Sequence, residues 1–254
     1  VTPASLLAHH RRVLAEAPVD IFILGDVDPS ELREEVARRL PLQPGVRRFP
    51  DTVVKRSPDR PVKDVVDRLD VNQGVVVIGF RSGITLRDEL YFPMLVANGV
   101  LGGFSHSKLF QEVREKRGLA YSVYSYHSSY RSAGAFGVYA GVSPRMVGAT
   151  LDVVTGVLSE LGRRGVTEEE LAEAREQLKG QLMLGLESTS SRMSRLGRGE
   201  LIRGFVHSPD EVIARVDAVT RNQVNELAHR LFVEERRVLA VVGPKETEHE
   251  LQRW

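Results

Sequence analysis

The sequence lacks cysteine, long apolar runs and an excess of charge of either sign. Without cysteine there is no disulfide framework and no thiolate zinc site; this fits a reducing compartment, and we expect a cytoplasmic protein. The longest apolar runs, such as residues 74–80, have the length of a strand and not the ~20 residues of a membrane span. Lys and Arg number 35 against 34 Asp and Glu, unlike the basic footprint of a nucleic-acid binder. We therefore expect neither a membrane nor a nucleic acid as partner.

The first residues do not predict a secretory signal, because they contain no basic segment followed by an apolar core. What it does have is the composition of a folded protein, with 42% hydrophobic and 27% charged residues. Its 254 residues are enough for one large domain or two small ones.

The first segment, residues 1–45, has the pattern helix, strand, helix. Periodicity predicts a helix from Thr2 to about Ala15, and "VDIFILGD" (19–26) is typical of a buried strand. The following "DPSELREEVARRL" predicts a helix with Asp28 as N-cap and Pro29 at the first helical position. Five prolines between residues 41 and 61 then interrupt any sustained period, and we predict a linker over 46–62.

The second segment, residues 63–254, alternates strands and helices. Strands are predicted at 64–71 and 74–80, joined through Asn72 to Gly74, and a helix at about 86–98. After "GVLGGFS", Ser105 is the expected N-cap of a helix ending at Gly118. The remaining predictions are paired strands at 119–130 and 134–142, helices at about 145–163 and from Thr167, shorter helices to about 231, and a strand at 237–243 before a polar tail.

One comparison within the chain concerns its two ends. Residues 1–25 and 219–243 align without a gap at an offset of 218, and helix, strand and terminal glycine recur in the same order. Either this order recurs by chance, or the chain begins inside the tail of one module and ends at the tail of the next. In the second case we expect the chain to be the back part of a duplicated protein.

The segment from Gly99 to Val142, "GVLGGFSHSKLFQEVREKRGLAYSVYSYHSSYRSAGAFGVYAGV", resembles the second-half signature of the pitrilysin and insulinase family of zinc peptidases, which includes mitochondrial processing peptidase. The resemblance covers about residues 63–243. It implies an α+β module, a mostly antiparallel sheet covered by helices on one face, in a protein whose two halves close around an extended peptide. The expected partners are therefore an extended peptide or unfolded protein, the protein's own N-terminal half and/or a homologous catalytic subunit, with a dimer as the expected assembly.

The metal motif of that family is absent from this sequence. The family's first half carries His-x-x-Glu-His and a distal glutamate, ligands that leave one zinc position open for water. None of the seven histidines here lies in such a motif. His9 and His10 are adjacent on a predicted helix, so their side chains point apart, and "EHE" (248–250) is read as a frayed tail. The expected zinc site therefore belongs to the N-terminal half or to a partner subunit, and no cofactor is expected in this chain.

Two residues of "VREKRGLAYSVYSY" (113–126) match positions with a catalytic role in the family. By resemblance, Tyr121 would donate a hydrogen bond to the oxyanion that forms on the scissile carbonyl. Arg114 would hold a substrate carbonyl or carboxylate with paired donors. The structural alternative is that Arg114 is a solvated cation at a helix C-terminus and that Tyr121 packs in a sheet.

The loop before that helix is the candidate substrate-binding segment, formed by Gly102, Gly103, Phe104, Ser105 and His106. Its glycines can expose backbone donors to a substrate, or they can simply permit a tight turn between helices. The loop departs from the commoner family form by containing Phe104 and His106, as in members that pair with a catalytic partner. The leading prediction is a peptide-binding second half that completes a zinc site elsewhere, and the alternative is a non-catalytic assembly or processing subunit.

Overall fold

The computed structural model describes residues 1–16, 19–40 and 65–251. Contacts divide the chain into two compact units, Val1–Val53 with Gly185–Val206, and Val54–Leu184 with His207–Trp254. The predicted linker, 46–62, lies outside the described residues. The division into modules 1–45 and 63–254 therefore stays a prediction.

The first unit contains helices α1 (Pro3–Glu16), α2 (Pro29–Arg39) and α6 (Thr189–Arg198), which continues into a π-helical turn, Gly199–Arg203. The predicted cap of α2 is confirmed, because Asp28 Oδ1 accepts hydrogen bonds from the backbone N–H groups of Ser30 (2.8 Å) and Glu31 (3.0 Å).

The strand predicted at 19–26 is wrong, since the structure has no strand there. A strand needs a hydrogen-bonded neighbour, and the described residues of this unit include no other strand. Phe22 instead packs against Gly197 of α6, where a Cβ would lie 3.2 Å from the ring. The two segments that align in sequence, 1–25 and 219–243, each contain the predicted helix. Only the second also contains the predicted strand, at 237–243.

The second unit is built on a five-stranded sheet in the order β1-β5-β2-β4-β3. The strands are β1 (Val65–Arg68), β2 (Gly74–Arg81), β3 (Ala120–Ser129), β4 (Gly134–Val142) and β5 (Arg237–Gly243). All neighbours are antiparallel except β1 and β5, which confirms the mostly antiparallel sheet. The two strands predicted to follow each other through Asn72–Gly74 are not neighbours, because β5 lies between them and pairs with both.

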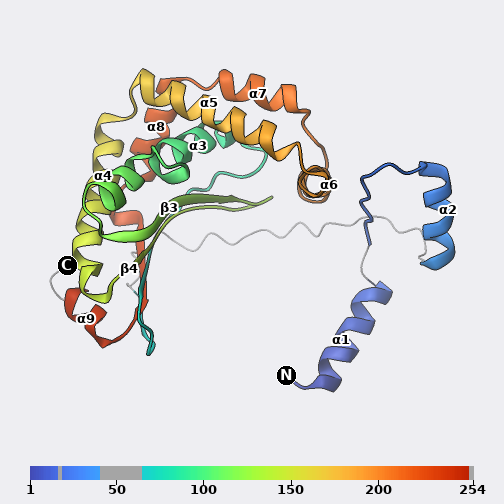
Figure 1. Cartoon of the computed structure of the whole chain (residues 1–254), viewed down its shortest axis with the longest axis horizontal. Helices are drawn as coiled ribbons and strands as arrows, with labels where there is room; N and C mark the ends of the chain where they lie inside the picture. Colours follow the sequence, from blue (N-terminus) through green and yellow to red (C-terminus); the bar gives the residue numbers. More distant parts are fainter. Residues whose placement is uncertain (17–18, 41–64, 252–254) are drawn as a thin grey trace. The chain divides into compact units, whose positions relative to one another are not determined.

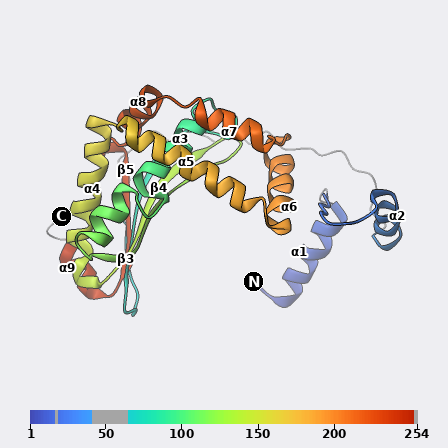
Figure 2. The same cartoon turned by 45° about the horizontal axis from the view of Figure 1, so that its top comes forward.

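Helices cover one face of this sheet, as the sequence resemblance implied (Figure 1, Figure 2). They are α3 (Tyr91–Asn98), α4 (Val147–Arg164), α5 (Glu168–Gly185), α7 (Pro209–Asp217), α8 (Arg221–Leu231) and α9 (Lys245–Leu251). Alternate strand residues such as Ile78 and Phe136 are buried against helical residues such as Leu151 and Val224. Within the described residues, no helix is both long enough and apolar enough to cross a membrane.

Two helix boundaries differ from the prediction. Helix α3 begins at Tyr91 and not at 86, because the preceding residues form turns in which Asp88 Oδ1 accepts a hydrogen bond from the N–H of Leu90 (2.8 Å). The segment read as a frayed tail is helix α9. Its Thr247 is 1% exposed, and the hydroxyl donates to the carbonyl of Pro244 (2.6 Å).

The segment after α3 lies directly on strand β3. A π-helical turn, Gly99–Gly103, extends α3, and Gly102 within it is buried. A Cβ at Gly102 would collide with the backbone nitrogen of Ser125 in β3. The Ser125 hydroxyl donates to Asn98 Oδ1 (2.8 Å), which adds a polar bond to this contact. The chain therefore reaches the candidate loop from a fixed position on the sheet.

We expect Gly102→Ala to lower the free energy of unfolding by about 1–3 kcal/mol, since the methyl group meets backbone that cannot move aside cheaply. The matched control is Gly180→Ala, in the interior of α5, where no atom lies within 4 Å of the added Cβ. This control should raise the unfolding free energy by about 0.5–1 kcal/mol. Urea denaturation followed by circular dichroism measures both. Equal effects of the two substitutions would contradict the close contact at Gly102.

Candidate functional site

Arg114 lies in the last turn of the helix that follows the loop. This helix runs from Lys108 to Glu115 and takes π-helical form from Phe110 onward. Its end is as predicted, because Gly118 has a left-handed φ of 60° and its N–H donates to the carbonyl of Arg114 (3.0 Å). Its start differs from the prediction, because the helix begins three residues after Ser105, which is therefore not its N-cap. The Ser105 hydroxyl instead lies 3.4 Å from His106 Nδ1. The glycine turn leads directly into strand β3.

Tyr121 occupies an irregularity at the start of β3. Ala120 pairs with Val142 and Ser122 pairs with Gly141, so the register shifts across Tyr121. A bulge of this kind leaves one residue out of the ladder and redirects its side chain. Tyr121 is accordingly 80% exposed, although it belongs to a strand of the sheet.

The structure brings Arg114 and Tyr121 together. The guanidinium carbon of Arg114 lies 4.8 Å from the centroid of the Tyr121 ring and 4.8 Å from that of Phe110. Contacts of a cation with ring faces stabilise an exposed pair by about 0.5–1 kcal/mol. They restrain the guanidinium while leaving its N–H donors able to bind an acceptor. The pair therefore forms a surface site with a cation and a phenol hydroxyl.

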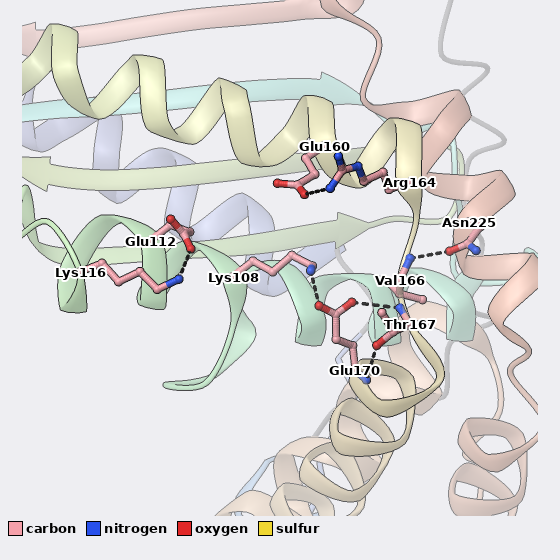
Figure 3. Close-up of polar contacts among 9 residues, drawn as sticks. All are labelled: Lys108, Glu112, Lys116, Glu160, Arg164, Val166, Thr167, Glu170 and Asn225. Atoms are coloured by element: carbon pink, nitrogen blue, oxygen red, sulfur yellow. Dashed lines mark hydrogen bonds and ion pairs between the residues drawn. The ribbon is translucent and has the colours of Figure 1, made fainter.

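The carboxylate of Glu112, on the same helix as Arg114, is engaged with other cations. Glu112 accepts hydrogen bonds from Lys116 (2.5 Å; Figure 3) and from Arg117. These hydrogen bonds, that of Lys116 first, lower the pKa of Glu112. Arg114 has only a 4.0 Å contact with the exposed carboxylate of Glu115. Its charge is thus less neutralised than those of its neighbours.

The five loop residues have different environments. Gly103, Ser105 and His106 are exposed, and Phe104 is half-buried over Gly99. Gly102 is buried against β3, a position that supports the tight-turn interpretation for this glycine. Beyond the loop lies a groove of about 700 Å³ whose other wall is α5. Sequence reasoning missed that wall, although Glu170, Glu173 and Gln177 have the spacing of one helix face.

A metal site is not formed by the part of the chain that the structure describes, where no three His, Cys, Asp or Glu residues are grouped to hold an ion. His9 and His10 are exposed on α1, as expected from their adjacent positions. His127 packs against the Tyr91 ring (5.9 Å between centroids), and its burial lowers its pKa. The donor groups of the described residues therefore do not fit a zinc centre.

Residues 1–178 match the family model described as the peptidase M16 inactive domain, and the chain belongs to this family. An uncharacterized zinc protease of Bacillus subtilis is 41% identical over 187 residues, which are 74% of this chain and 45% of that protein. The solved structure of a conserved protein from Enterococcus faecalis V583 has a TM-score of 0.78 and 30% identity, over 97% of this chain and 56% of that one.

A third comparison concerns a larger assembly. A chain of complex III2 from Candida albicans has the same fold, with a TM-score of 0.71 and 21% identity over 88% of this chain and 54% of that one. The present chain spans about half the length of the curated relatives it matches. The match to the family model confirms the family that the segment Gly99–Val142 predicted.

We expect Glu112→Gln to lower the free energy of unfolding by about 0.5–1 kcal/mol at pH 7, the upper range for partly exposed ion pairs. Because folding lowers the pKa of Glu112, this contribution is fully present above the reference value of 4.5. It is lost as the pH falls through the lower folded pKa. Urea denaturation at pH 7 and pH 3, with Glu115→Gln as control, measures it. A difference from wild type that is as large at pH 3 as at pH 7 would contradict this assignment.

Proposed function

We propose that this chain is the peptide-binding second half of a zinc-dependent peptidase, and that it supplies Arg114 and Tyr121 to an active site whose zinc ligands lie in the N-terminal half or in a partner subunit. The observation that carries the proposal is the contact between the Arg114 guanidinium and the Tyr121 ring at a strand bulge on the surface. Membership of the M16 family and the naming of relatives as zinc proteases support it.

The chemistry of the pair suits peptide hydrolysis. An exposed phenol hydroxyl can donate a hydrogen bond to the oxyanion that develops when the amide carbonyl is attacked. Arg114 can bind a carbonyl or carboxylate of the substrate, because a guanidinium offers paired donors. Its contacts with Phe110 and Tyr121 restrain it before the substrate arrives, which reduces the entropy lost on binding.

The sheet edge supports a proposal for the substrate class. Among the strands that the structure describes, β3 is the last on its side of the sheet, so its outer backbone groups can pair with an added extended strand. We propose an extended peptide or unfolded protein as substrate, in the cytoplasm. The chain's own N-terminal half, a homologous catalytic subunit, or both would be its partners in a dimer. The fold shared with a chain of a multisubunit complex is compatible with such pairing.

A second candidate function is a non-catalytic subunit that keeps the fold for assembly. One observation favours it: Phe104 covers Gly99 and Gly102 is buried against β3, so part of the loop serves packing. Activity measurements on the protein paired with its zinc-bearing half or subunit separate the two functions.

Tyr121→Phe should lower the turnover of an unstructured fluorogenic peptide by about 10²-fold in that paired protein, since one oxyanion donor is removed. Tyr124→Phe is the matched control, because Tyr124 also lies on β3 and is 43% exposed, and it should leave turnover unchanged. Circular dichroism and gel filtration check fold and pairing. If Tyr121→Phe keeps full turnover, Tyr121 is a structural residue and the non-catalytic function is favoured.

The purified chain alone should contain no stoichiometric zinc and should not cleave the same peptide, because its described residues offer no ligand cluster. Elemental analysis after dialysis against zinc, with a bound-metal standard, measures the content. One tightly held zinc per chain would refute the assignment of the metal to another half or subunit.

A further inference from the structure

The groove beside the loop is elongated and belongs entirely to the second unit. One wall is the segment from Gly99 to Lys108, and the other is a face of α5 from Glu170 to Leu184. At 1.5 Å per helical residue, this face is about 21 Å long. An extended polypeptide of about six residues has the same length. A compact small molecule would fill only part of it.

The groove contains a polar group without a partner. Ser107 is 4% exposed, and its hydroxyl has no hydrogen-bond partner among the described residues. Buried hydroxyl groups are nearly always satisfied, because an unmade hydrogen bond costs free energy. Ser107 lines the groove, and although its oxygen itself is covered, rotation about the Cα–Cβ bond can turn the hydroxyl toward a ligand that supplies the missing partner.

The charges along the groove favour a cation. Lys108 and Glu170 neutralise each other, and the second oxygen of Glu170 accepts a hydrogen bond from the N–H of Thr167 (3.0 Å; Figure 3). Glu173 is exposed on the same wall and has no ion pair within the described part of the chain.

The neighbouring carboxylate adds to this negative charge. Glu176 contacts Lys179 (2.7 Å), but Lys179 also contacts Asp217 (2.9 Å), so one cation serves two carboxylates. Together with Glu173, the cluster has an excess of about two negative charges, which attract a positively charged group.

The far end of the groove presents one large apolar side chain, that of Leu184, beside Gln181. Leu184 is 68% exposed there, and Gly180, one turn earlier, has no atom within 4 Å of a Cβ position. A glycine inside a helix costs stability, and here it leaves space open along the wall. The distance along α5 from Glu173 to Leu184 is about 16 Å, which five residues of extended chain span.

We propose that this groove binds an extended polypeptide that carries a lysine or arginine and, about five residues away, an apolar side chain. The basic side chain lies against Glu173 and Glu176, the apolar one against Leu184, and the Ser107 hydroxyl bonds the main chain between them. This inference shares with the proposed function only the premise of a polypeptide ligand. It uses neither Arg114 nor Tyr121, and so the two proposals fail separately.

The first test measures the charge preference with the whole chain. A fluorescein-labelled Gly/Ser peptide with Arg and Leu five residues apart is compared, by fluorescence anisotropy, with the peptide in which neutral citrulline replaces Arg. The Arg peptide should bind about 10-fold more tightly. The double variant Glu173→Gln, Glu176→Gln should abolish this preference, whereas Glu169→Gln, on α5 but outside the groove, should keep it. Equal binding of the two peptides to the wild-type chain would overturn the proposal.

The second test fills the groove without disturbing the core. Gly180→Leu places a side chain in the open space of the groove and should lower the affinity for the Arg peptide at least about 10-fold. Gly156→Leu, at an equally open helical glycine of α4 outside the groove, should not change binding. Unchanged affinity in Gly180→Leu would place the peptide elsewhere and overturn the proposal. The ratio of affinities for the Arg and citrulline peptides should be the same in Arg114→Ala as in the wild-type chain, whatever the absolute affinity. Loss of that ratio in Arg114→Ala would assign the charge preference to the site of the proposed function and overturn the proposal.

Discussion

The placement of both candidate sites depends on one close approach, that of Gly102 to strand β3. Because Gly102 has no side chain, the turn that follows α3 lies against the backbone of Ser125, and the Ser125 hydroxyl donates a hydrogen bond to Asn98, the last residue of α3. The exposed loop and the helix from Lys108 to Glu115 follow from this point. One end of that helix borders the groove with α5, and the other carries Arg114. A shift of the contact between Gly102 and β3 would therefore move both candidate sites.

Local signals in the sequence were sufficient for much of the site. Gly118 ends its helix because glycine adopts the left-handed conformation without strain, and the aromatic residues after it form β3 as their composition indicates. Arg114 and Tyr121 are seven residues apart, so a helix end, a glycine turn and a strand start determine their proximity. The bulge that exposes Tyr121 was not predictable, since it depends on the register with β4.

Features that depend on distant parts of the chain were missed. The composition of 19–26 suits a strand, but a strand forms only beside a partner, and the described residues of its unit supply none. A local sequence pattern equally cannot predict that β5 lies between β1 and β2. The same holds for the groove, whose walls are more than sixty residues apart along the chain at Lys108 and Glu170. The family resemblance gave the fold class without giving any of these contacts.

The position of β5 also has a consequence for how the protein folds. Strands β2, β4 and β3 can pair once residue 142 has left the ribosome. Strand β1 has β5 as its neighbour and waits for residues 237–243, the last of the described strands to be synthesised. Until then, the inner edge of β2 presents unpaired backbone groups, which are a template for association with other chains. Closing the sheet this late joins segments of very large sequence separation, a property of slowly folding proteins. Strand β5 thus controls when the sheet stops being open to aggregation.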